Sequence, residues 1–293
     1  AYEREQIIEI NATRINARYL PEVIFPPNIH CSDDYQTVLS GVQDILIVVP
    51  SAVFHANLVK LKPFLQSNQR LLWASKGLDT KKHQLLNEVV KEILGDKEMA
   101  VLSGPSFAKE VAMGLPTAIN IASENYNFAH DLLLRFQTKR FRVEITSDII
   151  GVELGGAMKN VLAIAVGITE GLGFGANAKA AVITYGLSEM IELGLVLGAK
   201  QETFLGLSGL GDLVLTCTDN QSRNRRLGLA LGRGQTLEET KKLIGTTEGY
   251  DTAKNIFYLL EKYAIKAPFC EGVYRILYEK KSPPTLFKTL FNE

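Results

Sequence analysis

The run ILIVV at residues 45–49 is continuously apolar and ends at Pro50. This pattern is typical of a strand that is buried on both faces of a parallel sheet. The alternation of strand and helix patterns then continues along the chain. Strands are predicted at 70–75, 99–104, 117–123 and 141–146, and helices at 52–65, 81–94, shortly after Pro105 and at 125–136. Strands separated by helices of this length indicate parallel βαβ units, so we expect a doubly wound α/β layer.

The second half of the chain has a different pattern. After Ser147 the periodicity predicts helices at 151–171, 178–198, 221–232, 247–263 and 268–279, and no strand alternation remains. We therefore expect an α/β domain over residues 1–146 and an all-α domain over residues 147–293. The cleft between two such domains is a common place for a cofactor and a substrate to meet.

The composition disfavours several classes of protein. Lys plus Arg and Asp plus Glu number 32 each, so no net charge attracts nucleic acid or anionic membranes. The three cysteines are widely spaced and form no CxxC or Cys/His cluster, which argues against a disulfide framework or a metal site. No uninterrupted apolar run approaches the roughly 18 residues of a membrane span. We expect no signal peptide, and a cytoplasmic protein without nucleic-acid or membrane partners.

An ammonium group lies in the middle of the apolar stretch VELGGAMKNVLAIAVG (152–167), at Lys159. Gly155 and Gly156 precede it by one helical turn and leave room for a ligand or another backbone to approach. A partly desolvated lysine has a lowered pKa and exchanges protons near neutral pH. Alternatively, the stem of Lys159 covers apolar surface while its ammonium group reaches water. The segment by itself leaves both interpretations open.

Three predicted strands lead into small, hydroxyl-bearing or cationic residues. SGPSFAKE (103–110) follows one strand, WASKGL (73–78) places Lys76 at the end of another, and VVPS (48–51) ends a third. The carboxyl ends of neighbouring parallel strands meet at one edge, and α/β sheets bind their ligands there. We therefore predict a ligand-binding crevice at this edge.

The stretch DLVLTCTDNQSRNRRLG (212–228) predicts an anion site. Asp212 opens a helical turn, and Thr216 lies one turn later on its face. Ser222 or Asn220 is placed to cap the next helix, which leaves backbone N–H groups free at its start. Because arginines follow, such a helix start favours a phosphate group. A capped, solvated helix start is the alternative, and the neutral net charge disfavours a nucleic-acid patch.

The usual dinucleotide-binding fingerprint is missing. It is GxGxxG between the first strand and the first helix, but the chain has no glycine before Gly41. GLGFGA (171–176) fits GxGxxA, yet it lies between two predicted helices and cannot make a strand-to-helix turn. We reject it as a cofactor motif and expect that this sequence begins after the true one.

Together these stretches resemble the bacterial NAD(P)-dependent glycerol-3-phosphate dehydrogenases. The resemblance runs in order from Ala1 to about residue 280, through NARYLP, ILIVVPS, WASKGL, SGPSFAKE, LPTAI, FRV, IGVELGGAMKN, GFGANAKAA and GLGDLVLTCTDNQSRNRRLG. It implies a Rossmann-like doubly wound α/β domain, without its first strand, glycine loop and helix in this sequence, followed by an all-α domain. The chain departs from the family at Tyr185, where an arginine is usual.

The resemblance also implies roles for the matching residues. Lys159 is similar to the family's catalytic proton donor and acceptor, Lys76 to a second lysine near the reacting carbon, and Asp212 would tune and hold Lys159. The residues similar to those that hold the substrate are Lys76, Gly104, Ser106, Lys159, Asp212, Thr216, Ser222, Arg223 and Asn224. Those similar to residues that contact the dinucleotide are Tyr2, Lys76, Ala108, Arg223 and Glu248.

The activity that this resemblance implies is the interconversion of dihydroxyacetone phosphate and sn-glycerol 3-phosphate. Hydride transfer with NAD or NADP would supply glycerol phosphate for phospholipid synthesis, and the implied partners are the substrate and a second copy in a homodimer. Arg4 favours NADP and Glu3 beside it favours NAD, so the preference stays open. The alternatives are a related two-domain hydroxyacid dehydrogenase and a non-catalytic chain that keeps the helical domain as a dimerisation module.

Overall fold

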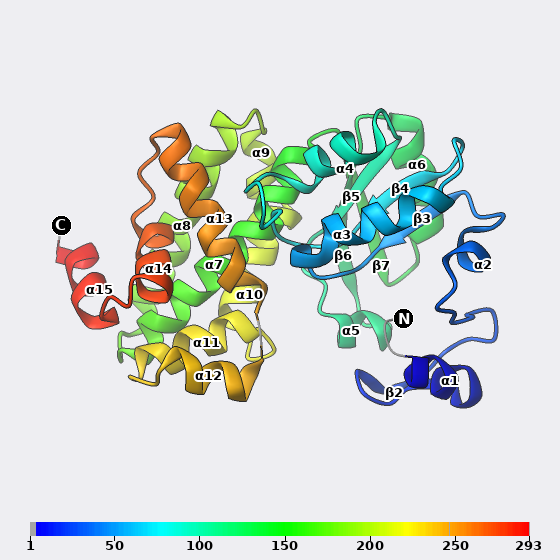
Figure 1. Cartoon of the computed structure of the whole chain (residues 1–293). Helices are drawn as coiled ribbons and strands as arrows, with labels where there is room; N and C mark the ends of the chain where they lie inside the picture. The colour runs from blue at the N-terminus through cyan, green and yellow to red at the C-terminus, as the bar shows by residue number, and fades with distance from the viewer. Residues whose placement is uncertain (1–3, 246, 293) are drawn as a thin grey trace.

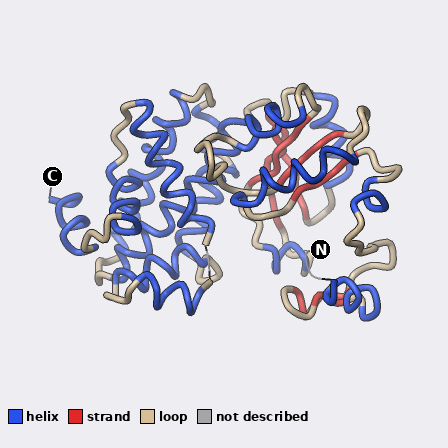
Figure 2. The backbone as a smooth tube through the Cα atoms, in the orientation of Figure 1, coloured by secondary structure: helices blue, strands red, loops and turns tan. Residues whose placement is uncertain are grey.

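The protein, as a computed structural model, is described over residues 4–245 and 247–292. It has two lobes, an α/β domain and a helical domain, which are joined between β7 and α7 (Figure 1). The strands lie in the first lobe, and the described part of the second consists of helices and loops (Figure 2). The last strand ends at Thr146 and the next helix begins at Ile149. We keep the domain boundary between residues 146 and 147 as a proposal.

A five-stranded sheet forms the centre of the α/β domain. Its strands follow the order β3 (Asp44–Ile47), β4 (Arg70–Trp73), β5 (Met99–Ser103), β6 (Thr117–Ala122) and β7 (Phe141–Thr146). β3, β4 and β5 are parallel to one another, and β6 is parallel to β7. The expectation of parallel pairing is wrong for one pair, because β6 runs antiparallel to β5. Their connection contains only the five-residue helix α5 (Ala108–Ala112) and returns from the same edge without a crossover.

Helices cover both faces of this sheet, as a doubly wound layer requires. Successive side chains of a strand point to opposite faces. Trp73 of β4 packs in one cluster with α3 (Ser51–Leu61) and α4 (Leu86–Leu94). Leu72, its neighbour in the same strand, packs in another cluster with α6 (Tyr126–Phe136). The doubly wound class that the sequence predicted is therefore confirmed.

The strand β3 corrects a detail of that prediction. Ile45 and Ile47 are buried against the α3 face, but Leu46 is 42% exposed and Val48, just past the strand, is 66% exposed. β3 is the edge strand of the described sheet, and the cluster beneath α6 contains residues of the other four strands but none of β3. The apolar run ILIVV is consequently buried on one face rather than on two.

The helix predicted at 81–94 begins later, because the chain turns before it. The side chain of Asp79 accepts hydrogen bonds through Oδ2 from the backbone N–H groups of Lys81 and Lys82, at 3.0 and 2.8 Å. Such bonds compete with helical hydrogen bonding. His83 then takes a left-handed conformation with φ of 56°, and α4 starts only at Leu86.

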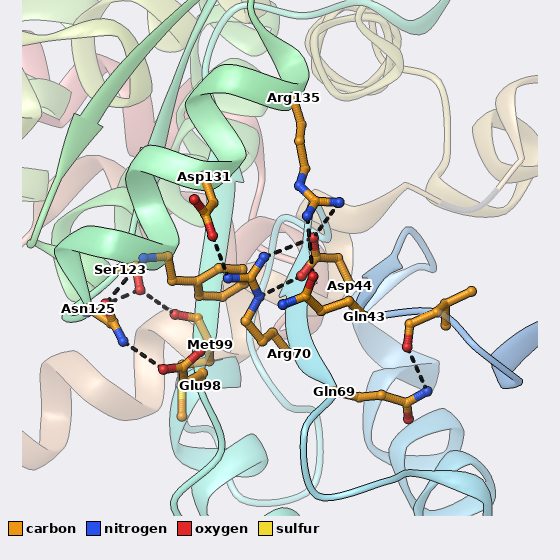
Figure 3. Close-up of polar contacts among 12 residues, drawn as sticks. Gln43, Asp44, Gln69, Arg70, Glu98, Met99, Ser123, Asn125, Asp131 and Arg135 are labelled. Atoms are coloured by element: carbon orange, nitrogen blue, oxygen red, sulfur yellow. Dashed lines mark hydrogen bonds and ion pairs between the residues drawn. The ribbon is translucent and has the colours of Figure 1, made fainter.

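Ion pairs hold the amino edge of the sheet (Figure 3). Arg70 donates to Asp44 (Nε to Oδ1, 2.7 Å) and to Asp131 of α6 (Nη1 to Oδ2, 2.9 Å). Arg135 also pairs with Asp44, at 3.1 Å. Because Asp44 and Arg70 are the first residues of β3 and β4, this network aligns the two strands and α6 at the edge opposite to the predicted crevice.

The helical domain is built around α7 (Ile149–Gly171). By length and hydropathy α7 could cross a membrane, but 94% of its most apolar window is buried inside the protein, which is typical of a core helix. The other elements of this domain are α8 (Ala176–Val196), α9 (Gln201–Leu205), the π-helical turn η2 (Leu207–Gly211), α10 (Asp212–Thr218), α11 (Arg223–Gly232), α12 (Leu237–Ile244), α13 (Glu248–Tyr263), α14 (Pro268–Tyr278) and α15 (Pro283–Asn292).

The helices α7 and α11 pack with their backbones in contact. A Cβ atom at Gly228 of α11 would overlap the backbone carbonyl of Ile164 in α7. A Cβ atom at Gly167 of α7 would likewise overlap the carbonyl oxygen of Arg225. Only glycine permits this approach. The contact fixes the start of α11 relative to the middle of α7, where Lys159 lies.

The helix predicted at 52–65 consists of α3 and the 3₁₀ turn η1 (Lys62–Phe64). The remaining elements of the α/β domain are short and were not predicted: α1 (Arg4–Thr13), the hairpin strands β1 (Ile15–Asn16) and β2 (Leu20–Ile24), and α2 (Tyr35–Leu39). In the helical domain, α9, α12 and α15 also lie outside the predicted helices.

Candidate active site

Three strand ends meet at the carboxyl edge of the sheet, as the sequence predicted. Ser75, beyond β4, donates its hydroxyl to the carbonyl oxygen of Val49, beyond β3, at 2.5 Å. Lys76 donates through Nζ to the carbonyl oxygen of Gly104, beyond β5, at 2.9 Å. The segments VVPS, WASKGL and SGPSFAKE are therefore neighbours in space.

Gly104 places its carbonyl group at this edge through an unusual backbone conformation. Its φ is 143°, and a Cβ atom there would lie 2.9 Å from the Cα of Ile119 in β6. A side chain would be strained on both counts. The carbonyl oxygen of Gly104 accepts from Lys76 and also from the hydroxyl of Ser106, at 2.9 Å. Gly104 and Ser106 thus lie beside Lys76.

Lys159 is buried, with 6% of its surface exposed. Its stem therefore does not carry the ammonium group out to water, and this alternative is wrong. Of the two glycines one turn earlier, Gly155 admits another backbone: a Cβ atom there would lie 2.6 Å from the carbonyl oxygen of Ser208 in η2. A Cβ atom at Gly156 would lie 2.7 Å from Ser103 Oγ.

One carboxylate holds both lysines. Asp212, the first residue of α10, is fully buried. Its Oδ1 accepts from Lys159 Nζ at 2.5 Å, and its Oδ2 accepts from Lys76 Nζ at 2.7 Å. Two cations and one anion leave a net positive charge in a buried place. Such a group attracts an anion or a developing oxyanion.

The pKa of Lys159 is lowered to about 8. Burial is the largest cause, because it disfavours the charged form, and the positive charge of Lys76 acts in the same direction. The carboxylate of Asp212 partly opposes both by stabilising the ammonium form. Lys159 can therefore gain and lose a proton close to neutral pH, as an acid or base in catalysis must.

The arginines at the start of α11 differ in exposure: one is buried and two are exposed. Ser222 is the N-cap, and its Oγ accepts from the backbone N–H of Arg225 at 3.1 Å. Arg225 is buried and donates through Nη2 to Glu170 of α7 at 2.6 Å, so its role is structural. Arg223, the first residue of the helix, and Arg226 are exposed. The predicted anion site therefore depends on Arg223 and the helix start.

A chain of amides connects this helix start to the lysines. Asn224 donates through Nδ2 to Asn160 Oδ1 at 2.9 Å, and its own Oδ1 accepts from the backbone N–H of Gly249 at 3.1 Å. Asn160 adjoins Lys159 in α7, and Gly249 adjoins Glu248 in α13. Burial raises the pKa of Glu248, while the charges of Lys159, Lys76 and Arg223 lower it. Glu248 thus lies within the field of these three cations.

Several polar groups of this region were missed from the sequence. Asn160, which follows Lys159 in the sequence, was assigned no role. Asn120 of β6 accepts through Oδ1 from the backbone N–H of Ser208 in η2, at 3.0 Å. The hydroxyls of Ser103 and Ser208 are buried without a hydrogen-bond partner. Unpaired buried hydroxyls in this place suit a polar ligand.

The two domains also touch beside the helix start. Gln221, just before α11, donates through Nε2 to Glu110 of α5 at 2.8 Å. This bond brings the segment 104–110 against the start of α11. Ala108 is exposed at the beginning of α5, close along the chain to Glu110. Ala108 is the residue of this segment that was predicted to contact the cofactor.

Three further residues were singled out in the sequence, and the structure describes two of them. Thr216 donates its hydroxyl to the backbone carbonyl of Asp212 at 2.6 Å, within α10. Tyr185 is 58% exposed on α8 and its ring stacks on Phe269, with centroids 6.1 Å apart. Tyr2, a predicted cofactor contact, lies outside the described residues.

A Rossmann-like domain whose strand ends face a helical domain with a buried lysine defines a class of two-domain nucleotide-dependent oxidoreductases. Two family models match the chain: the N-terminus of NAD-dependent glycerol-3-phosphate dehydrogenase over residues 1–129, and the C-terminus over residues 148–288. The chain belongs to the family of NAD-dependent glycerol-3-phosphate dehydrogenases.

Individual relatives agree with this assignment. The chain is 50% identical over 284 residues to a glycerol-3-phosphate dehydrogenase [NAD(P)+] of Bartonella henselae, covering 96% of this chain and 84% of the relative. It is 48% identical to that of Tolumonas auensis, over 96% and 85%. The crystal structure of a glycerol-3-phosphate dehydrogenase from Coxiella burnetii superimposes with a TM-score of 0.96 at 49% identity, covering 100% of this chain and 90% of that one.

Proposed function

We propose that this protein interconverts dihydroxyacetone phosphate and sn-glycerol 3-phosphate with NAD(H) or NADP(H). The observation that carries the proposal is the pair of lysines, Lys76 and Lys159, held by the single buried carboxylate of Asp212. The family and its named relatives supply the reaction class. The site supplies the acid and base that the reaction needs.

Reduction of a ketone places negative charge on its carbonyl oxygen. The ammonium group of Lys159 stabilises that oxygen and then gives it a proton. In the direction of oxidation, the neutral amine of Lys159 removes the proton of the substrate hydroxyl. Both forms are accessible because the pKa of Lys159 is about 8. Lys76 adds positive charge, and Asp212 holds both ammonium groups in place.

The phosphate group of the substrate would bind at the start of α11. Ser222 caps this helix, and Arg223 and Asn224 are its first two residues. Free N–H groups of a helix start and an arginine favour a phosphate dianion. Gly104 and Ser106 are distant from Lys76 in the sequence but lie beside it in the structure. They would contact the rest of the substrate.

The residues around the lysines fit the nicotinamide end of a dinucleotide. Ser103 and Ser208 have unpaired buried hydroxyls, and Glu248 lies in the field of Lys76, Lys159 and Arg223. Lys76, Ala108, Arg223 and Glu248 are the residues that would hold the cofactor. When bound, NAD(P)H supplies the hydride. The side chains of the protein bind, orient and exchange the proton.

We further propose a cytoplasmic protein that forms a homodimer and supplies glycerol phosphate for phospholipid synthesis. The proposed homodimer follows the resemblance to the family. Light scattering of the purified protein tests the homodimer, which predicts twice the monomer mass.

The test of the activity is the oxidation of NADH and of NADPH, followed by absorbance, when dihydroxyacetone phosphate is added to the purified protein. Substrate-dependent oxidation is the expected result. A matched panel of unphosphorylated dihydroxyacetone and of 2-oxo acids distinguishes a related dehydrogenase. Oxidation of a 2-oxo acid alone, or of no substrate at all, would contradict the proposal.

A further inference from the structure

A cavity lies between the two domains, lined by none of the residues assigned to the reaction. Its volume is about 360 Å³, which is within the usual range of small-molecule sites. One wall comes from the loop before α4 and from α4 itself, in the α/β lobe, and another from α13 in the helical lobe (Figure 1). Ile150, Leu197 and Leu259 make its apolar lining.

A buried carboxamide in this wall has no hydrogen-bond partner for its oxygen. Asn87 lines the cavity and is 6% exposed, and its Oδ1 is unpaired. The backbone N–H of Asn87 is bonded to the carboxylate of Glu153, at 3.2 Å, which fixes the residue in place. An unsatisfied buried amide oxygen is costly, and native proteins usually pair such groups with protein, water or a ligand.

Another lining residue of the cavity, His83, is held in an uncommon conformation. His83 has φ of 56°, in the left-handed region. Its Nδ1 lies 2.7 Å from Asn255 Oδ1 of α13, and its ring stacks on Tyr258 with centroids 4.2 Å apart. Residues in sparsely populated backbone conformations are concentrated at functional sites and ligand clamps. Here the conformation ties the loop of one domain to a helix of the other.

The lining includes the carboxylate of Glu88, which accepts from the backbone N–H of Leu85 at 2.9 Å, and the other groups suit a flat ligand with an anionic end. Tyr258, Tyr263 and Lys262 line the cavity with two aromatic rings and one ammonium group. Lys82 lines it as well, but its ammonium group is paired with Glu92 at 2.5 Å. The carboxamide of Asn87 offers a donor and an acceptor side by side. Adenine matches such a carboxamide with its N6 and N7 atoms, its ring stacks on aromatic side chains, and a phosphate group pairs with lysine.

We propose that this inter-domain cavity binds an adenine mononucleotide. Its adenine ring meets Asn87 and the tyrosines, and its phosphate group meets Lys262. Since the walls belong to both domains, the bound nucleotide bridges them at a place separate from Lys159 and Asp212.

The test is calorimetric titration of the purified protein with AMP in the presence of saturating NADH, so that the dinucleotide site is occupied. AMP is expected to bind to the wild type. Its Kd should rise about tenfold or more in Asn87→Ala, which removes the adenine contact, and severalfold in Lys262→Ala. Lys266→Ala, which changes an exposed lysine outside the cavity, serves as the matched control and should leave the Kd unchanged.

Adenosine and ribose 5-phosphate test the contributions of the base and of the phosphate group to binding. Adenosine should bind to the wild type more weakly than AMP does. The wild type and Lys262→Ala should bind adenosine with equal Kd, because adenosine has no phosphate group for Lys262 to contact. Ribose 5-phosphate, without the base, should not compete. Circular dichroism and turnover of the variants, expected to equal those of the wild type, show that the fold is intact.

The proposal is overturned by any of three results: no AMP binding to the wild type, complete loss of AMP binding when NADH is added, or equal Kd values in the wild type, Asn87→Ala and Lys262→Ala. If Asn87→Ala fails to fold, Lys262→Ala alone decides, because its side chain is exposed. The dehydrogenase assay is independent of these results.

Discussion

Lys159 of the core helix α7 donates to Asp212 Oδ1 at 2.5 Å, and this ion pair is buried. The other oxygen of the carboxylate holds Lys76, from the α/β domain, at 2.7 Å. Asp212 therefore connects the two domains at the point where the chemistry is proposed. Removing one partner of a buried ion pair leaves an uncompensated charge, so the three residues depend on one another.

Asp212→Asn should remove the two effects of this carboxylate, which raises the pKa of Lys159 and holds both ammonium groups in place. Asp212 raises the pKa of Lys159, so its loss should move that pKa below about 8. Because reduction needs the ammonium form, its pH profile should begin to fall at lower pH, and turnover should drop by about 10²-fold or more. The pH dependence of kcat measures this. Asp219→Asn, at the end of α10, is the control, and an unshifted profile in Asp212→Asn would refute the assignment.

Lys159→Met should abolish proton transfer while preserving the apolar packing of the stem. We expect turnover to fall by about 10²–10⁴-fold, with the Kd of NADH changed little, since Lys76 and Glu248 remain. Stopped-flow kinetics and a fluorescence titration measure the two quantities. Lys266→Met, an exposed lysine, controls for the substitution itself. Normal turnover in Lys159→Met would show that another group transfers the proton.

The two directions of the reaction should have opposite pH dependence. Below about pH 8 Lys159 is mainly protonated, and above it mainly neutral. Reduction of dihydroxyacetone phosphate should therefore be constant at neutral pH and fall about tenfold per pH unit well above 8. Oxidation of glycerol 3-phosphate should instead rise toward pH 8 and then level. Parallel profiles of kcat in both directions would contradict this role.

Arg223→Ala should weaken substrate binding more than it slows the chemical step. The loss of one charge-assisted hydrogen bond predicts that KM for dihydroxyacetone phosphate rises about tenfold or more. Arg226→Ala removes an exposed arginine from the same helix and should leave KM unchanged. Steady-state kinetics of the two variants decide. Equal KM values for both variants and the wild type would move the phosphate site elsewhere.

Gly228→Ala should destabilise the fold, because its methyl group would overlap the backbone of α7 at Ile164. Overpacking of this kind costs about 1–3 kcal/mol, and more where backbone must move. Gly175→Ala is the control, since open space surrounds that position. Urea unfolding measures the two free energies of unfolding. A stability equal to that of the control would show that α7 and α11 separate without cost.

Local sequence was sufficient for much of the fold and for the reactive groups. The periodicity predicted the five strands of the sheet and α7, and Ser222 was one of two predicted caps for α11. Thr236 and Glu239 form a capping box, a sequence pattern that also indicates the start of α12. The antiparallel turn to β6 was missed because a short helix between two strands has the pattern of a crossover.

The partners of those groups could not be predicted from spacing. Asp212 is 53 residues from Lys159 and 136 from Lys76, so their contact depends on how the domains pack. Asn160 and Asn224, 64 residues apart, meet only because α7 and α11 are in backbone contact. A sequence motif identifies a candidate lysine or amide. The hydrogen-bond partner of that side chain depends on tertiary packing.

The reversal of chain direction between β5 and β6 determines how freely the sequence between these strands can vary in length and composition. Since β6 starts at the edge where β5 ends, the residues from Gly104 to Pro116 never cross the sheet and lie wholly on the side of Lys76. A crossover must match the length of the sheet, but this segment need only return to its own edge. Its length and composition can therefore change with the ligand while the strand register stays the same, which makes it the natural place to alter substrate preference.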